Sequence, residues 1–266
     1  MSDAIESIQH EERSFAPAAA FSAHAHVESF DDYKKLHQRA TDEPEAFWDE
    51  IAQEFTWFKP YSSVLEWKAP DVKWFLGGQT NISANCLDRH VASSRRHKAA
   101  IITELENGEI QTLTYDQLLK EVCELAGALL DLGIQSGDRI GIYMPNCAQA
   151  ATAMLACARI GAVHSVIFGG FSANAIADRL NDCQASAVIT ADGLRRRGKT
   201  LDLKTVVDQA LESAPSVKHC VVYKNTGNKV EMASGRDHWW HDLTLNQKSF
   251  IEPAHLDSEH PLFLLY

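Results

Sequence analysis

Residues 139–170 read RIGIYMPNCAQAATAMLACARIGAVHSVIFGG, two short apolar runs joined by a longer helical segment. The runs at 139–144 and 162–168 have the length and β-branched content of buried strands. Asn146 is placed to cap the helix between them, and Gly161 follows as a helix-ending glycine. A strand, a helix and a second strand in this order form a βαβ unit, which predicts a parallel sheet.

The same alternation continues on both sides of this unit. Upstream, Thr114 and Gln117 form a capping box for a helix that Gly133 ends, and downstream Ser172 is placed to cap another helix. The chain is therefore predicted to have an α/β fold, with βαβ units around a mostly parallel sheet. Further strands are predicted at 99–104, 109–114, 186–190 and 219–224, with a helix near 201–213 and a type I′ hairpin turn at Asn107-Gly108.

The beginning of the chain lacks this alternation. Residues 1–27 show no sustained period and are predicted to form a mobile tail. Apolar residues at helical spacing from 31 to 55 predict two helices, the second opened by Pro44. Residues 57–81 are dense in aromatic side chains and are interpreted as an irregular lid over a larger domain. A stacking platform for nucleic acid is the less favoured alternative, because few basic residues interleave the aromatic ones.

Composition narrows the classes of function. The 266 residues carry a formal net charge of −11, which disfavours nucleic acid as the main partner. The start, MSDAIESIQHEER, is acidic and lacks the apolar run of a signal peptide, and no run reaches the length of a membrane span. The six cysteines lie far apart without a CxxC pair, as expected of reduced thiols. These features predict a soluble cytoplasmic protein with neither a nucleic-acid nor a membrane partner.

Two loops come directly after predicted strands, where open α/β sheets bind their ligands. The first is Phe168-Gly169-Gly170-Phe171-Ser172. Paired glycines allow a ligand to approach the backbone closely, and the helix that follows offers unpaired N–H groups. A tight turn that needs a positive φ would explain the same glycines, so both interpretations stay open at this point.

The second loop, residues 192–199, is strongly basic in an otherwise acidic chain. It reads DGLRRRGK and holds three arginines and a lysine around a glycine. Arginine presents a fork of donors that suits phosphate oxygens, and lysine adds a point charge. The sequence therefore predicts a phosphate site here, and the alternative is a solvated run of charges.

Familiar catalytic motifs are absent from the sequence, which contains no GxSxG, HExxH or GxxxxGK[ST] element. His164 lies within a predicted strand and is interpreted as a hydrogen-bonded core residue in preference to a general base. His24 and His26 alone would make an incomplete metal site. No catalytic residue and no metal site is therefore predicted in this chain.

Four long motifs give the chain a family resemblance from about residue 28 to Tyr266. Together they resemble the amino-terminal half of the acetyl-coenzyme A synthetase family, the AMP-forming acetate–CoA ligases of the adenylate-forming superfamily. The motifs are KWFLGGQTNISANCLDRH (73–90), GDRIGIYMPN (137–146), CARIGAVHSVIFGGFSANAIADRLND (157–182) and VITADGLRRRGK (188–199).

The resemblance implies a reaction in two steps. Acetate and ATP give acetyl-adenylate and pyrophosphate, and the CoA thiol then displaces AMP to give acetyl-CoA. The family's residues for the 3′-phosphate of CoA match Arg196 and Lys199, with Arg197 and Gly198 between them. Which of Arg195 to Arg197 faces the phosphate stays open. The family's FGGFS turn runs beside the pantetheine of CoA, which implies contacts at Phe168, Gly169 and Gly170.

The resemblance also divides the chain into the tail (1–27), a helical and aromatic-rich amino-terminal cap (28–88) and the first part of an AMP-binding domain (89–266). HPLFLLY, residues 260–266, is predicted to enter a buried parallel strand that ends where the family's phosphate-binding loop begins. The large domain is thus expected to be incomplete, without the ATP and Mg²⁺ sites or the catalytic lysine, and inactive alone. Alternatives are a propionate–CoA ligase fragment, or a non-catalytic CoA-binding or interaction module that associates with the missing half or with a full-length ligase.

Overall fold

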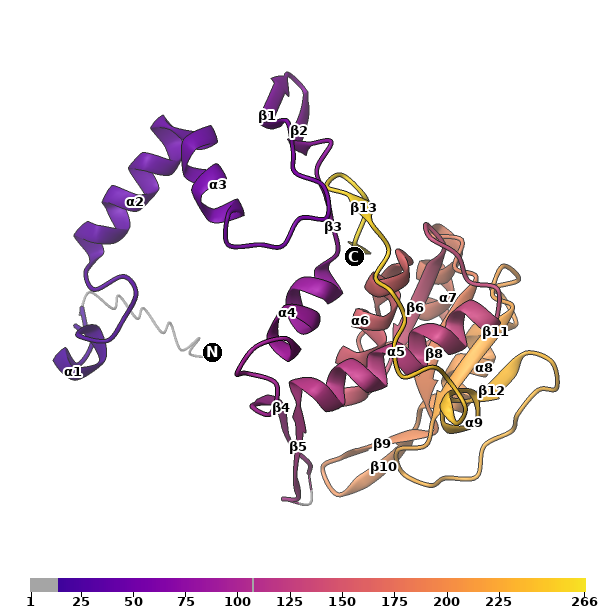
Figure 1. The fold of residues 1–266 in the computed structure, drawn as a ribbon. Coiled ribbons are helices and arrows are strands. Elements are labelled where there is room, and N and C mark those ends of the chain that lie inside the picture. Colours follow the sequence, from indigo (N-terminus) through magenta and orange to yellow (C-terminus); the bar gives the residue numbers. More distant parts are fainter. Residues whose placement is uncertain (1–13, 107) are drawn as a thin grey trace, which may run out of the picture. The chain divides into compact units, whose positions relative to one another are not determined.

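The computed structural model describes residues 14–106 and 108–266 and is drawn as a ribbon in Figure 1. The chain divides into two units, Met1–Glu54 and Phe55–Tyr266, and each is described by itself. No helix among the described residues is both long enough and apolar enough to cross a membrane.

The first unit is helical. It contains α1 (Ala19–Ser22), α2 (Phe30–Asp42) and α3 (Pro44–Ala52), so the two helices predicted between 31 and 55 are confirmed. Ser29 caps α2, because its Oγ accepts a hydrogen bond from the backbone N–H of Asp32 at 3.1 Å. Residues 1–13 of the predicted tail lie outside the described residues.

The second unit is built around a sheet of six strands, in the order β12-β11-β8-β6-β7-β14. Four of them, β6, β8, β11 and β12, are labelled in Figure 1. Each neighbouring pair in this sheet is parallel, as predicted. The strands are β6 (Arg139–Tyr143), β7 (Val163–Val166), β8 (Ala187–Ala191), β11 (His219–Tyr223), β12 (Asp237–Trp239) and β14 (Phe263–Leu264).

Helices bury both faces of this sheet. Successive strand residues point to opposite faces, so Ile140 and Ile142 pack with α5 and α6, whereas Tyr143 packs with α7 and α8. Burial on both faces explains why the central strands are continuous apolar runs in the sequence. The helices are α5 (Tyr115–Asp131), α6 (Ala148–Ile160), α7 (Ala173–Asp182), α8 (Leu203–Leu211) and α9 (Trp240–Thr244).

The helix ends follow the predicted capping residues with one exception. Thr114 and Gln117 form the capping box of α5, and Gly161 ends α6 in the left-handed conformation with a φ of 78°. The prediction for Asn146 is wrong. Cys147 is the N-cap of α6 and makes no side-chain hydrogen bond there, because the extended backbone continues one residue further than predicted.

Residues 63–76 of the aromatic-rich segment form a regular hairpin, so the expectation of an irregular segment is wrong there, whereas its role as a lid stays a prediction. Strands β1 (Ser63–Lys68) and β2 (Asp71–Leu76) pair antiparallel, and the rings of Trp57, Tyr61 and Phe75 pack against one another. Cross-strand pairing satisfies the backbone groups that an irregular segment would leave to water.

Buried polar residues tie the next segment to α6. Strand β3 (Gln79–Thr80) pairs with β13 (Leu256–Asp257), and a single π-helical turn, η1 (Ala84–Asp88), leads into α4 (Arg89–Val91). Asn81 Nδ2 donates to the carbonyl oxygens of Ala158 and Ala254, and the fully buried Arg159 pairs with both oxygens of Asp88 at 2.9 Å.

The hairpin predicted upstream of α5 is present as β4 (Ala99–Glu104) and β5 (Ile110–Thr114), which pair antiparallel. Gly108 has a φ of 81°, in the region that favours glycine. The predicted turn type also depends on Asn107, which lies outside the described residues.

At the edge of the sheet, β14 is a parallel strand, as predicted, and pairs with β7, but the expected burial is wrong. Phe263 is 50% exposed and Leu265 78% exposed. The strand is two residues long and, among the described residues, pairs with a neighbour on one side only, so its apolar side chains are not enclosed by two strands.

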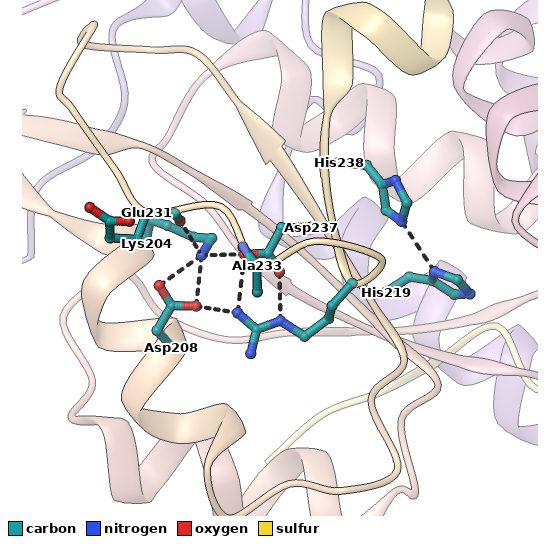
Figure 2. A network of polar contacts seen from close by, with 8 residues as sticks. Lys204, Asp208, His219, Glu231, Ala233, Asp237 and His238 are labelled. Atoms are coloured by element: carbon teal, nitrogen blue, oxygen red, sulfur yellow. Dashed lines mark hydrogen bonds and ion pairs between the residues drawn. The ribbon is translucent and has the colours of Figure 1, made fainter.

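A buried ion cluster fixes the segment that leads into β12 (Figure 2). We call Lys204, Asp208, Arg236 and Asp237 the α8–β12 ion cluster. Lys204 Nζ lies 2.6 Å from Asp208 and 2.8 Å from Asp237, and Arg236 pairs with both carboxylates. The side chains of Lys204 and Asp237 have almost no exposed surface. Water therefore cannot stabilise their charges, and each charge is stabilised by its ion-pair partners instead.

Candidate functional site

A cavity of about 530 Å³ lies at the carboxyl ends of the parallel strands. The segments that follow β6, β7, β8 and β11 meet there, and the β4–β5 hairpin contributes acidic residues. The lining consists of Glu104, Leu105, Glu106, Glu109, Gln111, Met144, Pro145, Asn146, Cys147, Phe168, Gly169, Leu194, Arg195, Arg196 and Asn225.

The strand order explains why a cavity opens at this point. From β6 the chain proceeds to β7 on one side of it, whereas β8 lies on the other side. The chain leaves β6 for α6 on one face of the sheet and leaves β8 for α8 on the opposite face. Segments that diverge in this way leave a crevice between them, and open α/β sheets bind ligands at such a switch point.

The glycines after β7 are explained by close packing and not by unusual backbone angles. Neither Gly169 nor Gly170 has a positive φ. A Cβ atom on Gly169 would lie 3.3 Å from the carbonyl oxygen of Met144, and one on Gly170 would lie 2.8 Å from the ring of Phe168. The interpretation as a turn that needs a positive φ is therefore wrong, and the approach of a ligand to these glycines stays a prediction.

Tyr143 on β6 holds this loop in place. Its hydroxyl lies within hydrogen-bond distance of the carbonyl oxygens of Gly169, at 3.3 Å, and Phe171, at 3.1 Å. The side chain is buried, and burial raises the pKa of the phenol, so the hydroxyl keeps its proton and acts as a donor. Ser172 then caps α7 by accepting a hydrogen bond from the backbone N–H of Ala175, as predicted.

The basic segment forms a β-hairpin, which the sequence analysis did not predict. Strands β9 (Gly193–Arg196) and β10 (Lys199–Asp202) pair antiparallel around Arg197 and Gly198, whose φ values are 52° and 71°. Two successive positive φ values are typical of the type I′ turn that matches the twist of a hairpin. Arg196 lies directly opposite Lys199, so the two side chains share one face of the hairpin.

The structure brings only part of the predicted site together at the cavity. Phe168, Gly169 and Arg196 belong to its lining, whereas Gly170, Arg197, Gly198 and Lys199 lie beside it in the chain and are outside the lining set. The segment 144–147, Asn225 and the acidic residues were missed. The sequence could have indicated 144–147 and Asn225 because they also follow predicted strands. The order of the strands, which brings these segments together, cannot be predicted from residues close in the chain.

The cavity lining contains acidic as well as basic side chains. Glu104, Glu106 and Glu109 belong to the same lining as Arg195 and Arg196. The backbone N–H of Gly198 donates a hydrogen bond to Glu106 Oε1 at 3.0 Å. A carboxylate thus already binds the turn of the basic hairpin, which indicates that this turn suits an anion.

The thiol in the cavity lining is not activated. Burial raises the pKa of Cys147, so the sulfur stays protonated at neutral pH and is a weak nucleophile. Across residues 14–106 and 108–266, no group of three or more His, Cys, Asp or Glu side chains is arranged to hold a metal ion.

His164 lies on β7, buried as predicted, but its expected hydrogen bond is not found. Its Nδ1 has no hydrogen-bond partner among the described residues, and burial lowers its pKa to about 4. A neutral imidazole in the sheet, outside the cavity lining, is therefore part of the core.

His164 is expected to make stability depend on pH. The unfolded chain takes up the proton near pH 6.5 and the folded chain only near pH 4, so the free energy of unfolding decreases as the pH falls between these values. His164→Leu should reduce the loss of stability between pH 7.5 and 4.5 by about 2 to 3 kcal/mol, measured by urea unfolding. An unchanged loss in the variant would contradict this expectation.

Two family models match adjoining parts of the chain. Residues 33–86 match the model described as acetyl-coenzyme A synthetase N-terminus, and residues 87–266 match the model described as AMP-binding enzyme. The chain is 51% identical to the acetyl-coenzyme A synthetase of Chlorobaculum tepidum, over 100% of this chain and 40% of that protein. It is 48% identical to the acetyl-coenzyme A synthetase of Deinococcus radiodurans, over 99% and 41% respectively.

A solved structure shares the fold. Acetoacetyl-CoA synthetase from Streptomyces lividans superposes with a TM-score of 0.82 and 28% identity, covering 93% of this chain and 38% of that one. The chain thus spans about 40% of the length of the curated relatives that it matches. With a family model matched over residues 87–266 and the same fold in a solved relative, the chain belongs to the AMP-binding enzyme family.

Proposed function

We propose that this chain supplies the CoA-binding part of an AMP-forming acetate–CoA ligase. The complete reaction would convert acetate, ATP and CoA into acetyl-CoA, AMP and pyrophosphate. The observation that carries the proposal is the cavity that joins Phe168 and Gly169 to Arg196, since the family resemblance assigns these loops to the same ligand.

The two walls of the cavity suit the two chemically different ends of CoA. Arg196 and Lys199 share a face of the β9–β10 hairpin and offer charge-assisted hydrogen bonds to a 3′-phosphate. Gly169, which has no Cβ, lets the extended pantetheine amides pass close to the backbone after β7. The positive charge of Arg196 would hold the phosphate end of CoA, and the space beside Gly169 would hold the pantetheine, so the two together would orient CoA along the cavity.

The acetate and ATP steps of the proposal rest on the relatives and not on residues of this chain. The matched relatives are named acetyl-coenzyme A synthetases, and the chain spans about 40% of their length. The family resemblance assigns the ATP and Mg²⁺ sites and the catalytic lysine to the part of such a ligase that follows the matched region. We therefore expect binding of CoA by this chain without adenylation of acetate.

Calorimetric titration of the 266-residue chain with CoA and with 3′-dephospho-CoA tests the proposal. CoA should bind about tenfold or more tightly, because the 3′-phosphate adds charge-assisted hydrogen bonds. Equal affinity for the two ligands would contradict the assignment of the basic hairpin. An ATP–pyrophosphate exchange assay with acetate should give no exchange, and robust exchange would overturn the expectation that adenylation needs more of the ligase.

A further inference from the structure

Asp192 is a fully buried carboxylate at the junction of β8 and β9. Its Oδ1 accepts hydrogen bonds from the backbone N–H groups of Gly193 at 2.7 Å, Asn225 at 2.8 Å and Thr226 at 2.9 Å, and from Thr226 Oγ1 at 3.1 Å. Its Oδ2 accepts from the N–H of Gly227 at 2.7 Å. The described residues offer it no ion pair, so four backbone N–H groups and one hydroxyl stabilise its charge.

The carboxylate is ionised in the folded chain. Burial acts to raise its pKa, but the hydrogen bonds from Thr226, Asn225, Gly227 and Gly193 lower it below the ordinary value. An ionised carboxylate is acceptor-only on both oxygens, which matches a shell made entirely of donors.

These hydrogen bonds join two segments that both line the cavity. Gly193 begins the β9 strand that carries Arg195 and Arg196, and Asn225 follows β11. Asn225 Nδ2 donates back to the carbonyl oxygen of Gly193 at 2.9 Å, so the junction is fastened from both sides.

The backbone at Gly193, where β8 leads into β9, is closely packed and leaves no space for a side chain. A Cβ atom on Gly193 would lie 2.7 Å from Thr226 Oγ1 and 2.7 Å from the carbonyl oxygen of Leu201. Beyond this point the hairpin has four paired positions and a two-residue turn, and residues 195–202 are largely exposed. The direction in which the hairpin leaves the sheet is therefore set at its base by Asp192 and the residues that bind it, and the hydrogen bond from Gly198 to Glu106 adds a second contact at its turn.

We propose that Asp192 is a positioning residue that holds Arg196 at the cavity and thereby sets the preference for the 3′-phosphorylated form of CoA. The inference rests on the proposed function. Asp192 does not belong to the cavity lining and acts only through the hairpin and the 225–227 segment.

Asp192→Asn tests this role with little change of shape. The amide can keep one acceptor oxygen, but its NH₂ group would face the N–H of Gly227 or the donors around Oδ1. The matched control is Asp237→Asn, which alters a carboxylate of the α8–β12 ion cluster (Figure 2) whose side chain has no exposed surface and which lies outside the cavity lining. Both variants should lose stability, but only Asp192→Asn should change the hairpin.

Two measurements separate positioning from general destabilisation. Hydrogen exchange should become faster at residues 193–202 and 225–227 in Asp192→Asn and stay unchanged there in Asp237→Asn. The ratio of CoA to dephospho-CoA affinity, measured by calorimetry, should fall about five- to tenfold in Asp192→Asn and stay constant in Asp237→Asn. Thr226→Val removes one of the hydrogen bonds and should shift both readouts in the same direction by less.

The outcomes are distinguishable. Faster exchange at the hairpin together with a lost preference for CoA supports the proposal. If Asp192→Asn folds and keeps its preference for CoA over dephospho-CoA, the proposal is overturned. If Asp192→Asn does not fold, the proposal is overturned when Thr226→Val shows no change in hydrogen exchange or in that preference. Equal binding of the two ligands by the unsubstituted chain would instead overturn the proposed function, and the role of Asp192 with it.

Discussion

Arg196→Ala is expected to weaken the binding of CoA by about 10- to 100-fold and the binding of dephospho-CoA by less than about threefold. The Arg196 guanidinium lines the cavity and shares a hairpin face with Lys199. We therefore expect its main contribution to CoA affinity to come from hydrogen bonds to the 3′-phosphate. Dephospho-CoA lacks that phosphate and cannot lose the interaction. Calorimetric titration of both ligands against the variant measures the difference.

Arg195→Ala is the matched control for this prediction. Arg195 is the preceding residue, lies opposite Thr200 and points to the other face of the hairpin. Its removal takes away one positive charge, as Arg196→Ala does, so an effect of net charge alone would be equal in the two variants. A larger loss of CoA preference in Arg195→Ala than in Arg196→Ala would reverse the residue assignment.

Lys204→Met is expected to lower the free energy of unfolding by about 3 to 5 kcal/mol. The substitution keeps the length of the side chain but removes the charge that lies between Asp208 and Asp237 in the α8–β12 ion cluster. The side chain of Asp237 has no exposed surface, and among the described residues it would keep Arg236 as its one cation, while its ion pair with Lys204 would be lost. Urea unfolding of the variant and the unsubstituted chain measures the loss.

Lys120→Met controls for the loss of a helical ion pair. Lys120 and Glu124 on α5 have the same spacing as Lys204 and Asp208 on α8, but Lys120 is 64% exposed and its pair spans 3.7 Å. Exposed pairs of this type contribute about 0.5 kcal/mol or less. Similar losses in the two variants would show that burial does not distinguish the α8–β12 ion cluster.

Local patterns predicted most of the fold. The capping box at Thr114, the helix-ending Gly161 and the apolar runs of β6, β8 and β11 are each set by residues close in the chain, and the structure confirms them. The order of the strands could not be predicted in this way. It depends on which faces the helices cover, and that is decided by packing between distant segments.

Only part of the candidate site could be predicted from the sequence. The loops at 168–172 and 192–199 were found because ligand loops follow parallel strands. The β9–β10 hairpin was missed for two reasons. Its strands, GLRR and KTLD, are rich in charged residues and lack the alternation of apolar and polar residues that predicts a strand. Its turn has Arg197 at a position where asparagine or aspartate is the usual signal. Contact of Arg196, Lys199 and the Phe168–Gly170 turn with CoA stays a prediction.

The hydrogen bonds of Tyr143 have a consequence for how the cavity responds to a ligand. One strand, β6, leads directly into the wall at 144–147 and also anchors the loop at Gly169 and Phe171. These two walls therefore share a single rigid support and keep their spacing when the cavity is empty, so ordering them costs little entropy on binding. The β9–β10 hairpin, which carries Arg196, is held separately, at its base by Asp192 and at its turn by Glu106.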